Sequence, residues 1–117
     1  MDQTGCDHVA MALQLRIDFR PVDGASALRE GWRGLVDFGE RWTKDDADLW
    51  PRGSGAVPVG EPLVYGCELR QTVPARDELE EAVLNLWSLD KPRPVMRQGV
   101  SIRLLDGTNL RATGELL

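Results

Sequence analysis

The opening of the chain carries the most restrictive pattern, because apolar residues occupy every second position from residue 9 to residue 19. They are Val9, Met11, Leu13, Leu15, Ile17 and Phe19. Strict alternation predicts an antiparallel strand over residues 9–20 with one buried and one wet face. Twelve residues at about 3.3 Å each span roughly 40 Å, which is long enough to curl around a barrel.

Three further segments show strand signals. Residues 31–38 place Trp32, Val36 and Phe38 on one face, with Gly31 and Gly34 indicating bulges or close backbone approach. Residues 56–69 alternate from Leu63 onward, after two prolines that interrupt pairing. Residues 99–117 form a predicted hairpin around an Asp106–Gly107 turn.

In one segment the apolar residues follow the spacing of a helix instead of alternating. In residues 77–89, Leu79, Val83, Leu86 and Trp87 recur at helical spacing, and Asp77 with Glu80 matches a capping box. We therefore expect an amphipathic α-helix inserted at 76–89, with Trp87 packed against the strands. Residues 40–50 are ambiguous, and residues 51–55 read as a flexible loop.

These elements favour a mainly β, single-domain chain, either a small antiparallel barrel or a sandwich, with one helical insertion. Residues 1–8 are expected to be a flexible N-terminus and residues 9–117 the domain. A length of 117 residues allows one core of this kind without disulfide or metal staples.

Composition excludes several classes of protein. The net charge of −5 does not suit a general nucleic-acid binder, and no apolar run approaches a membrane span. The acidic N-terminus lacks the features of a signal peptide, so we expect a cytoplasmic location. With two cysteines, Cys6 and Cys67, in no Cys-x-x-Cys pair and one histidine, His8, no metal centre is expected, and Cys67 reads as a buried strand thiol.

Enzymatic motifs are missing as well. Neither of the two lysines, Lys44 and Lys91, follows a glycine, so a phosphate-binding loop for a nucleotide is excluded. Gly53-Ser54-Gly55 falls one residue short of a nucleophile elbow. We expect no catalysis and no cofactor. The acidic cluster Asp45, Asp46 and Asp48 reads as a solvated loop, although hard cations prefer such oxygens, so a small metal-dependent hydrolase stays an alternative.

Tryptophan and arginine alternate in the middle of the chain. Trp32, Trp42 and Trp50 lie near Arg33, Arg41 and Arg52. Both residue types are enriched at interface hot spots. Core packing is the simpler interpretation of Trp42. Trp32 and Arg33 are the first candidate contacts for a protein partner, and Trp50 and Arg52 are the second.

Charge is unevenly distributed along the chain. Residues 91–117 contain five basic and two acidic side chains, a net charge of +3. A local excess of cations is what a nucleic-acid surface needs. An RNA-binding module that uses Arg97, Arg103 and Arg111 of this basic C-terminal segment is therefore an alternative.

The last segment, together with three earlier ones, resembles a known family. Gly99, Ile102, Asp106-Gly107 and Gly114 fall in register with the closing hairpin of domain III of elongation factor Tu, with Ala112 where the family has its first glycine. Gly31-Trp32-Arg33 resembles the family's Gly-aromatic-Arg motif, though Gly34-Leu35 replaces the usual Pro-Gln. Phe19 to Gly24 and Val57 to Glu61 resemble two of its turns.

This resemblance implies a six-stranded antiparallel β-barrel whose relatives serve as binding surfaces. It covers the barrel alone, so it implies no GTPase activity. The helix expected at 76–89 is an insertion relative to the family. We therefore expect a stand-alone, non-catalytic module that engages a protein partner, with a connection to translation, and that uses neither membrane nor nucleotide.

Overall fold

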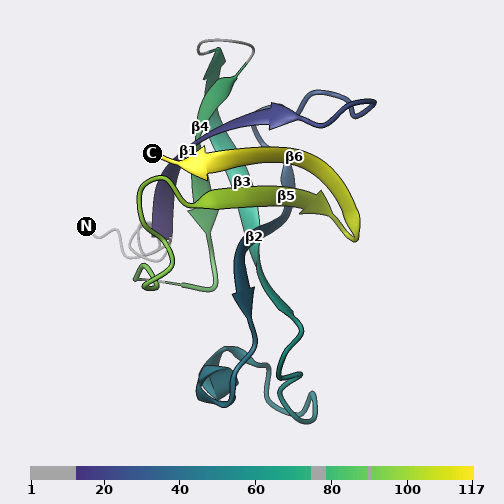
Figure 1. Ribbon diagram of the computed structural model, residues 1–117, viewed down its shortest axis with the longest axis vertical. Helices are drawn as coiled ribbons and strands as arrows, with labels where there is room; N and C mark the ends of the chain where they lie inside the picture. The colour runs from purple at the N-terminus through teal and green to yellow at the C-terminus, as the bar shows by residue number, and fades with distance from the viewer. Residues whose placement is uncertain (1–12, 75–78, 90) are drawn as a thin grey trace, which may run out of the picture.

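The computed structural model describes residues 13–74, 79–89 and 91–117, which form a closed six-stranded antiparallel β-barrel (Figure 1). The strands are β1 (Leu13–Pro21), β2 (Arg33–Arg41), β3 (Pro62–Pro74), β4 (Glu80–Leu86), β5 (Ser101–Asp106) and β6 (Asn109–Leu116). Around the barrel their order is β1-β4-β3-β2-β5-β6, and β6 pairs again with β1. The barrel is therefore confirmed and the sandwich alternative is wrong. The expected N-terminal flexibility at 1–8 and the first residues of the 9–20 strand lie outside the described residues.

Period-two burial builds the core, as the alternation predicted. Each strand points alternate side chains into one shared interior. The fully buried side chains include Ile17, Phe19, Val36, Leu63, Cys67, Leu69, Leu84, Leu86, Ile102 and Leu104. Leu13, Leu15 and Trp32 pack against this core while half-buried. The strand thiol at Cys67 is buried as expected, and burial raises its pKa to about 12, so it stays protonated.

The helix expected at 76–89 is wrong over the part that the structure describes. Residues 80–86 form β4, which pairs with β1 on one side and β3 on the other. Ala82, Leu84 and Leu86 point inward, so this segment also alternates. Two flanking strands supply hydrogen bonds and a buried face, and these tertiary contacts override the local helical period.

The β5–β6 hairpin closes the barrel, with one correction to its turn. Asp106 pairs with Asn109, so Gly107 and Thr108 are the loop residues rather than Asp106 and Gly107. Gly107 takes a φ of 65°, a region that favours glycine. At the seam with β1, a Cβ on Gly114 would overlap the carbonyl oxygen of Asp18, so the two backbones meet only because this residue is glycine.

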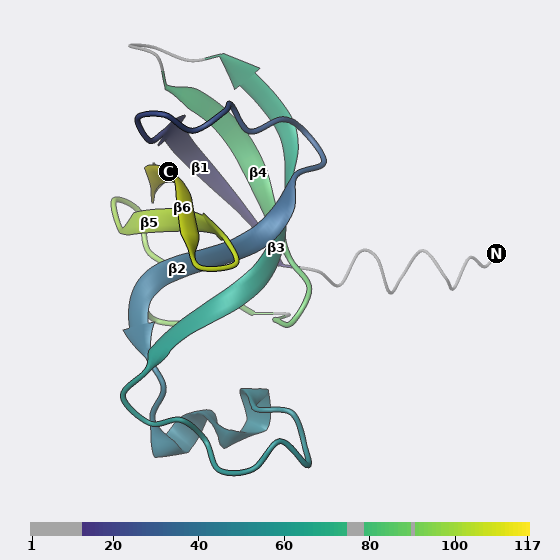
Figure 2. The ribbon, with the colours of Figure 1, turned by 90° about the vertical axis from the view of Figure 1, so that its right-hand side faces the viewer.

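A long connection between β2 and β3 lies beyond one end of the barrel (Figure 2). It contains η1 (Lys44–Leu49), a short 3₁₀ helix. Thr43 caps it, since its side chain accepts a hydrogen bond from Asp45 N–H while the Asp46 carboxylate accepts one from Thr43 N–H. Asp46 is therefore a buried cap, which corrects the interpretation of the acidic cluster as a fully solvated loop.

A matched pair of substitutions tests whether the side chains of β4 alternate between the inside and the outside of the barrel. Leu84→Ala removes a fully buried side chain and should lower the free energy of unfolding by about 2–5 kcal/mol. Val83→Ala removes an outward, half-buried one and should cost about 1 kcal/mol or less. Urea denaturation measures both values. A helix would reverse the order, since Val83 lies on its expected apolar face.

Candidate docking surface

An exposed Arg–Trp pair lies on the outer face of β2, β3 and β4. Trp87 directly follows β4 and is 51% exposed. The guanidinium carbon of Arg33 lies 5.5 Å from the centroid of the Trp87 ring, which is a cation–π geometry. The expected packing of Trp87 against the strands through a helix face is therefore wrong. The inward position of Leu86 turns Trp87 toward solvent.

Two neighbouring residues set the geometry of this pair. Gly66 of β3 lies beneath the ring, and a Cβ there would sit 3.9 Å from Trp87 Cε3. Glu68 of β3 accepts a hydrogen bond from Arg33 Nε at 3.4 Å and lies 3.7 Å from Arg70. Two guanidiniums thus share one carboxylate, and the local charge is positive. The Arg33 side chain stays 71% exposed, so its remaining N–H donors face solvent.

A hollow of about 230 Å³ adjoins this pair and shares Gly66 with it. Its walls come from the connection between β2 and β3, from β3 itself and from Ser88, which follows Trp87. Trp42 and Trp50 meet edge to face, with ring centroids 5.2 Å apart and planes at 81°. Trp50 Nε1–H donates to the Gly55 carbonyl at 3.1 Å, so the ring is held in place.

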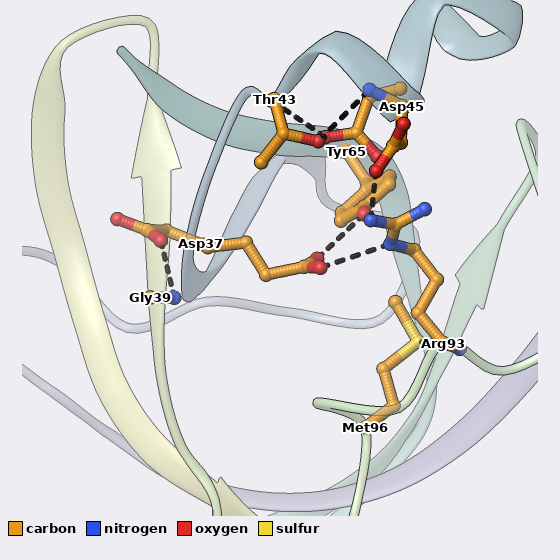
Figure 3. A network of polar contacts seen from close by, with 9 residues as sticks. Asp37, Gly39, Thr43, Asp45, Tyr65, Arg93 and Met96 are labelled. Carbon is orange, nitrogen blue, oxygen red and sulfur yellow. Dashed lines mark hydrogen bonds and ion pairs between the residues drawn. The ribbon is translucent and has the colours of Figure 1, made fainter. Parts of the chain in front are cut away.

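A partly buried polar network joins Tyr65 to Glu40, Arg93 and Asp46 (Figure 3). Tyr65 is one of the residues that line the hollow, and its buried hydroxyl donates to Glu40 at 2.7 Å. Arg93 then joins two segments, because its Nε donates to Glu40 at 3.0 Å and one terminal nitrogen donates to Asp46 at 2.8 Å. The side chains of Asp46, Glu40 and Arg93 are 5%, 14% and 26% exposed.

This environment shifts the pKa of three groups in the network, Asp46, Tyr65 and Arg93. The Thr43 backbone N–H, with help from the Thr43 hydroxyl and Arg93, outweighs burial and holds the pKa of Asp46 below its ordinary value. Burial and the Glu40 carboxylate raise the pKa of the Tyr65 hydroxyl. Burial alone would lower the pKa of Arg93, but its hydrogen bonds to Glu40 and Asp46 raise it overall.

The residues expected to contact a partner divide into two groups. Arg33 and Arg52 are exposed, and Trp50 is half-buried in the hollow wall. Trp32 is half-buried, and its ring lies where a Cβ on Gly34 would have to be, so it mainly packs against the core. Arg33 and Trp50 thus belong to one continuous surface through Gly66. We call this surface the docking face and define it by Arg33, Trp50, Gly66, Trp87 and Ser88.

The arginines of the RNA alternative are placed differently. Arg103 donates to Asp37 at 2.7 Å, and Arg111 contacts Asp106 and Ser26. Asp37 also accepts from Gly39 N–H at the β2 irregularity, so its ion pair supports the barrel. Arg97 is exposed in the loop before β5. Two of these three cations are therefore engaged by the chain itself.

The acidic cluster Asp45, Asp46 and Asp48 does not form a cation site in the described residues. Asp46 is already engaged by Thr43 and Arg93, while Asp45 and Asp48 are exposed. Within residues 13–74, 79–89 and 91–117, no group of three or more His, Cys, Asp or Glu side chains is placed to hold a metal. In the same ranges, no helix combines the length and apolar character needed to cross a bilayer.

The sequence analysis missed Trp87, Glu40, Tyr65 and Arg93. A period-two interpretation of residues 82–86 would have turned Trp87 outward. Glu40 and Arg93 are 53 residues apart, and no local pattern links them. Comparison of the chain with protein-family models, curated proteins and solved structures found no match.

The Arg93 bridge predicts a specific loss of stability. Arg93→Ala leaves Glu40 and Asp46 without the guanidinium that both accept from, and it should lower the free energy of unfolding by about 2–3 kcal/mol. Arg16→Ala, which removes an exposed ion pair to Glu81, should cost less than about 1 kcal/mol. Urea denaturation compares the two. Equal losses would show that the bridge is worth no more than a surface pair.

Asp46 predicts a dependence of stability on acid pH. A carboxyl whose folded pKa is depressed stabilises the fold above the unfolded pKa of about 3.9, and that contribution disappears as pH falls through the folded pKa. Thermal unfolding between pH 2 and 6 should therefore show a smaller acid-induced loss in Asp46→Asn than in the native chain. Asp45→Asn, at an exposed position, should retain the native profile. An unchanged profile in Asp46→Asn would contradict the assignment.

Proposed function

We propose that the barrel is a non-catalytic module that binds a protein partner through the docking face. The observation that carries this proposal is the Arg33–Trp87 pair, an exposed tryptophan held by a cation on the outer face of three strands. Tryptophan and arginine are the residues most enriched at energetic hot spots of interfaces. The adjoining hollow offers a concavity that a partner side chain can fill.

The charges on this face favour a protein over RNA. Arg103 and Arg111 are paired within the chain, and the connection over residues 40–61 contains five acidic and three basic side chains. A phosphate backbone would meet that excess of negative charge beside the hollow. A protein can match both signs, with carboxylates near Arg33 and cations near the acidic connection.

The resemblance to domain III of elongation factor Tu is the basis for proposing a partner connected with translation. Barrels of that family serve as binding surfaces, and Gly31-Trp32-Arg33, which resembles one of the family's motifs, contains Arg33 of the docking face. The cytoplasmic location stays a prediction from the sequence, as does the absence of a cofactor.

The proposed function is tested by comparing which proteins the native chain and its variants capture from cytosol. The immobilised full chain is incubated with cytosol from its source cells, with and without nuclease treatment, and bound species are identified by mass spectrometry. Arg33→Glu and Trp87→Ser should weaken binding of the partner by roughly 30-fold, because hot-spot residues contribute about 2 kcal/mol or more. Arg97→Glu, an equal charge change off this face, should bind as the native chain does.

Two outcomes would contradict the proposal. A species that both docking-face variants retain does not use the Arg33–Trp87 pair. A species that disappears with nuclease treatment and with Arg97→Glu is RNA or depends on RNA, which is the alternative function. Stability of each variant is checked by thermal unfolding, and both docking-face substitutions lie at exposed positions.

A further inference from the structure

The hollow beside Trp87 combines aromatic walls with negative surroundings. Trp42 and Trp50, whose ring planes meet at 81°, both line the hollow, and Tyr65 is a further lining residue. Aromatic faces carry negative potential and attract cations, most strongly when the cation is desolvated. Such a corner of tryptophans differs from a purely aliphatic groove, which would not distinguish a cation from a neutral group.

Charge around the hollow has the complementary sign. Behind Tyr65, Glu40 and Asp46 share one guanidinium, Arg93. In front, Asp45 and Asp48 are exposed on η1, whose last residue, Leu49, and the following Trp50 line the hollow. Residues 40–61 together with Arg93 contain five carboxylates and four cations. Acidic side chains are thus in excess by one around the hollow, in contrast to the positive Arg33–Arg70 side of the face.

Size and shape fit a long, thin cationic side chain. The hollow has a volume of about 230 Å³, many times the roughly 10–15 Å³ that holds one water on the same measure. A lysine carries a compact ammonium on a flexible four-carbon stem. The stem can lie along Pro51 and Val64 while the ammonium reaches the aromatic rings and remains close to the carboxylates.

We propose that this hollow is the anchor point of the docking face and accepts a lysine side chain of the protein partner. The inference rests on the proposed function and adds the chemistry of the partner's anchoring residue. The walls are pre-positioned, because Trp50 Nε1–H is bound by Gly55 and Tyr65 is fixed by Glu40. Little conformational order has to be created when the side chain enters.

Two capped tripeptides that differ only in the ammonium test this proposal. Acetyl-Gly-Lys-Gly-amide and acetyl-Gly-norleucine-Gly-amide are titrated into the ¹⁵N-labelled full chain, and the tryptophan indole N–H signals are followed by NMR. The lysine peptide should shift the Trp42 and Trp50 signals saturably and bind about tenfold more tightly than the norleucine peptide, as a desolvated cation–π contact predicts.

Matched variants separate the aromatic from the electrostatic contribution. Trp50→Leu removes one wall and should weaken binding of the lysine peptide about tenfold. The double substitution Asp45→Asn with Asp48→Asn keeps the walls, lies at exposed positions and should weaken binding two- to threefold. Val73→Ser changes an exposed apolar side chain of β3 that does not line the hollow, and it should leave the affinity unchanged. Thermal unfolding verifies that each variant is folded.

The results distinguish failure of this inference from failure of the proposed function. Equal binding of both peptides, no shift at Trp42 and Trp50, or full binding to Trp50→Leu would overturn the lysine anchor. Capture that still depends on Arg33 would then leave the proposed function standing. A selective lysine peptide with no protein captured would support the anchor site and overturn the proposed partner function as stated.

Discussion

The hydrogen-bonded seam between β1 and β6 is the constraint on which every other position in this structure depends. It closes the sheet, removes both edges, and fixes which residues of each strand face inward. The close approach of Gly114 to the Asp18 carbonyl sets the register there. Because side chains alternate with period two, a shift of one residue would turn a strand's outward residues into the barrel. The outward positions of Arg33 and Gly66 are thus consequences of closure.

The second constraint is the Arg93 bridge, which ties the connection after β2 to the loop before β5. Glu40 lies near the end of β2 and Asp46 in η1, and one guanidinium satisfies both carboxylates. Such a partly buried arrangement adds little net stability compared with apolar packing, but it allows few alternative geometries. Its structural effect is to hold η1, and with it Trp50, against β3. The hollow exists because a residue distant in sequence fixes the position of its wall.

Local periodicity in the sequence predicted most of the barrel, and long-range pairing decided the rest. Segments such as 13–19 and 63–69 alternate without ambiguity, and each became a strand. Residues 80–86 are compatible with both a helix and a strand, since Val83 and Leu86 fit helical spacing while Ala82, Leu84 and Leu86 alternate. Pairing with the flanking strands β1 and β3 decides in favour of the strand. Residue type alone pointed to Arg33 and Trp50 as candidate contacts. Trp87 was missed through the helix error, and the Glu40–Arg93 contact has no local signature because it joins residues 53 positions apart.

The contacts that hold the exposed tryptophans in place bear on the proposed docking function of this face. A tryptophan that is half exposed forgoes part of the free energy that its burial would contribute. Here Trp87 is fixed by Arg33 above Gly66, and Trp50 is fixed by the Gly55 carbonyl. Both rings are therefore held in place by contacts within the chain itself. Rigid aromatic groups lose little conformational entropy on binding, so a modest contact area can yield a useful affinity. Order of this kind favours docking onto a preformed face over folding upon binding.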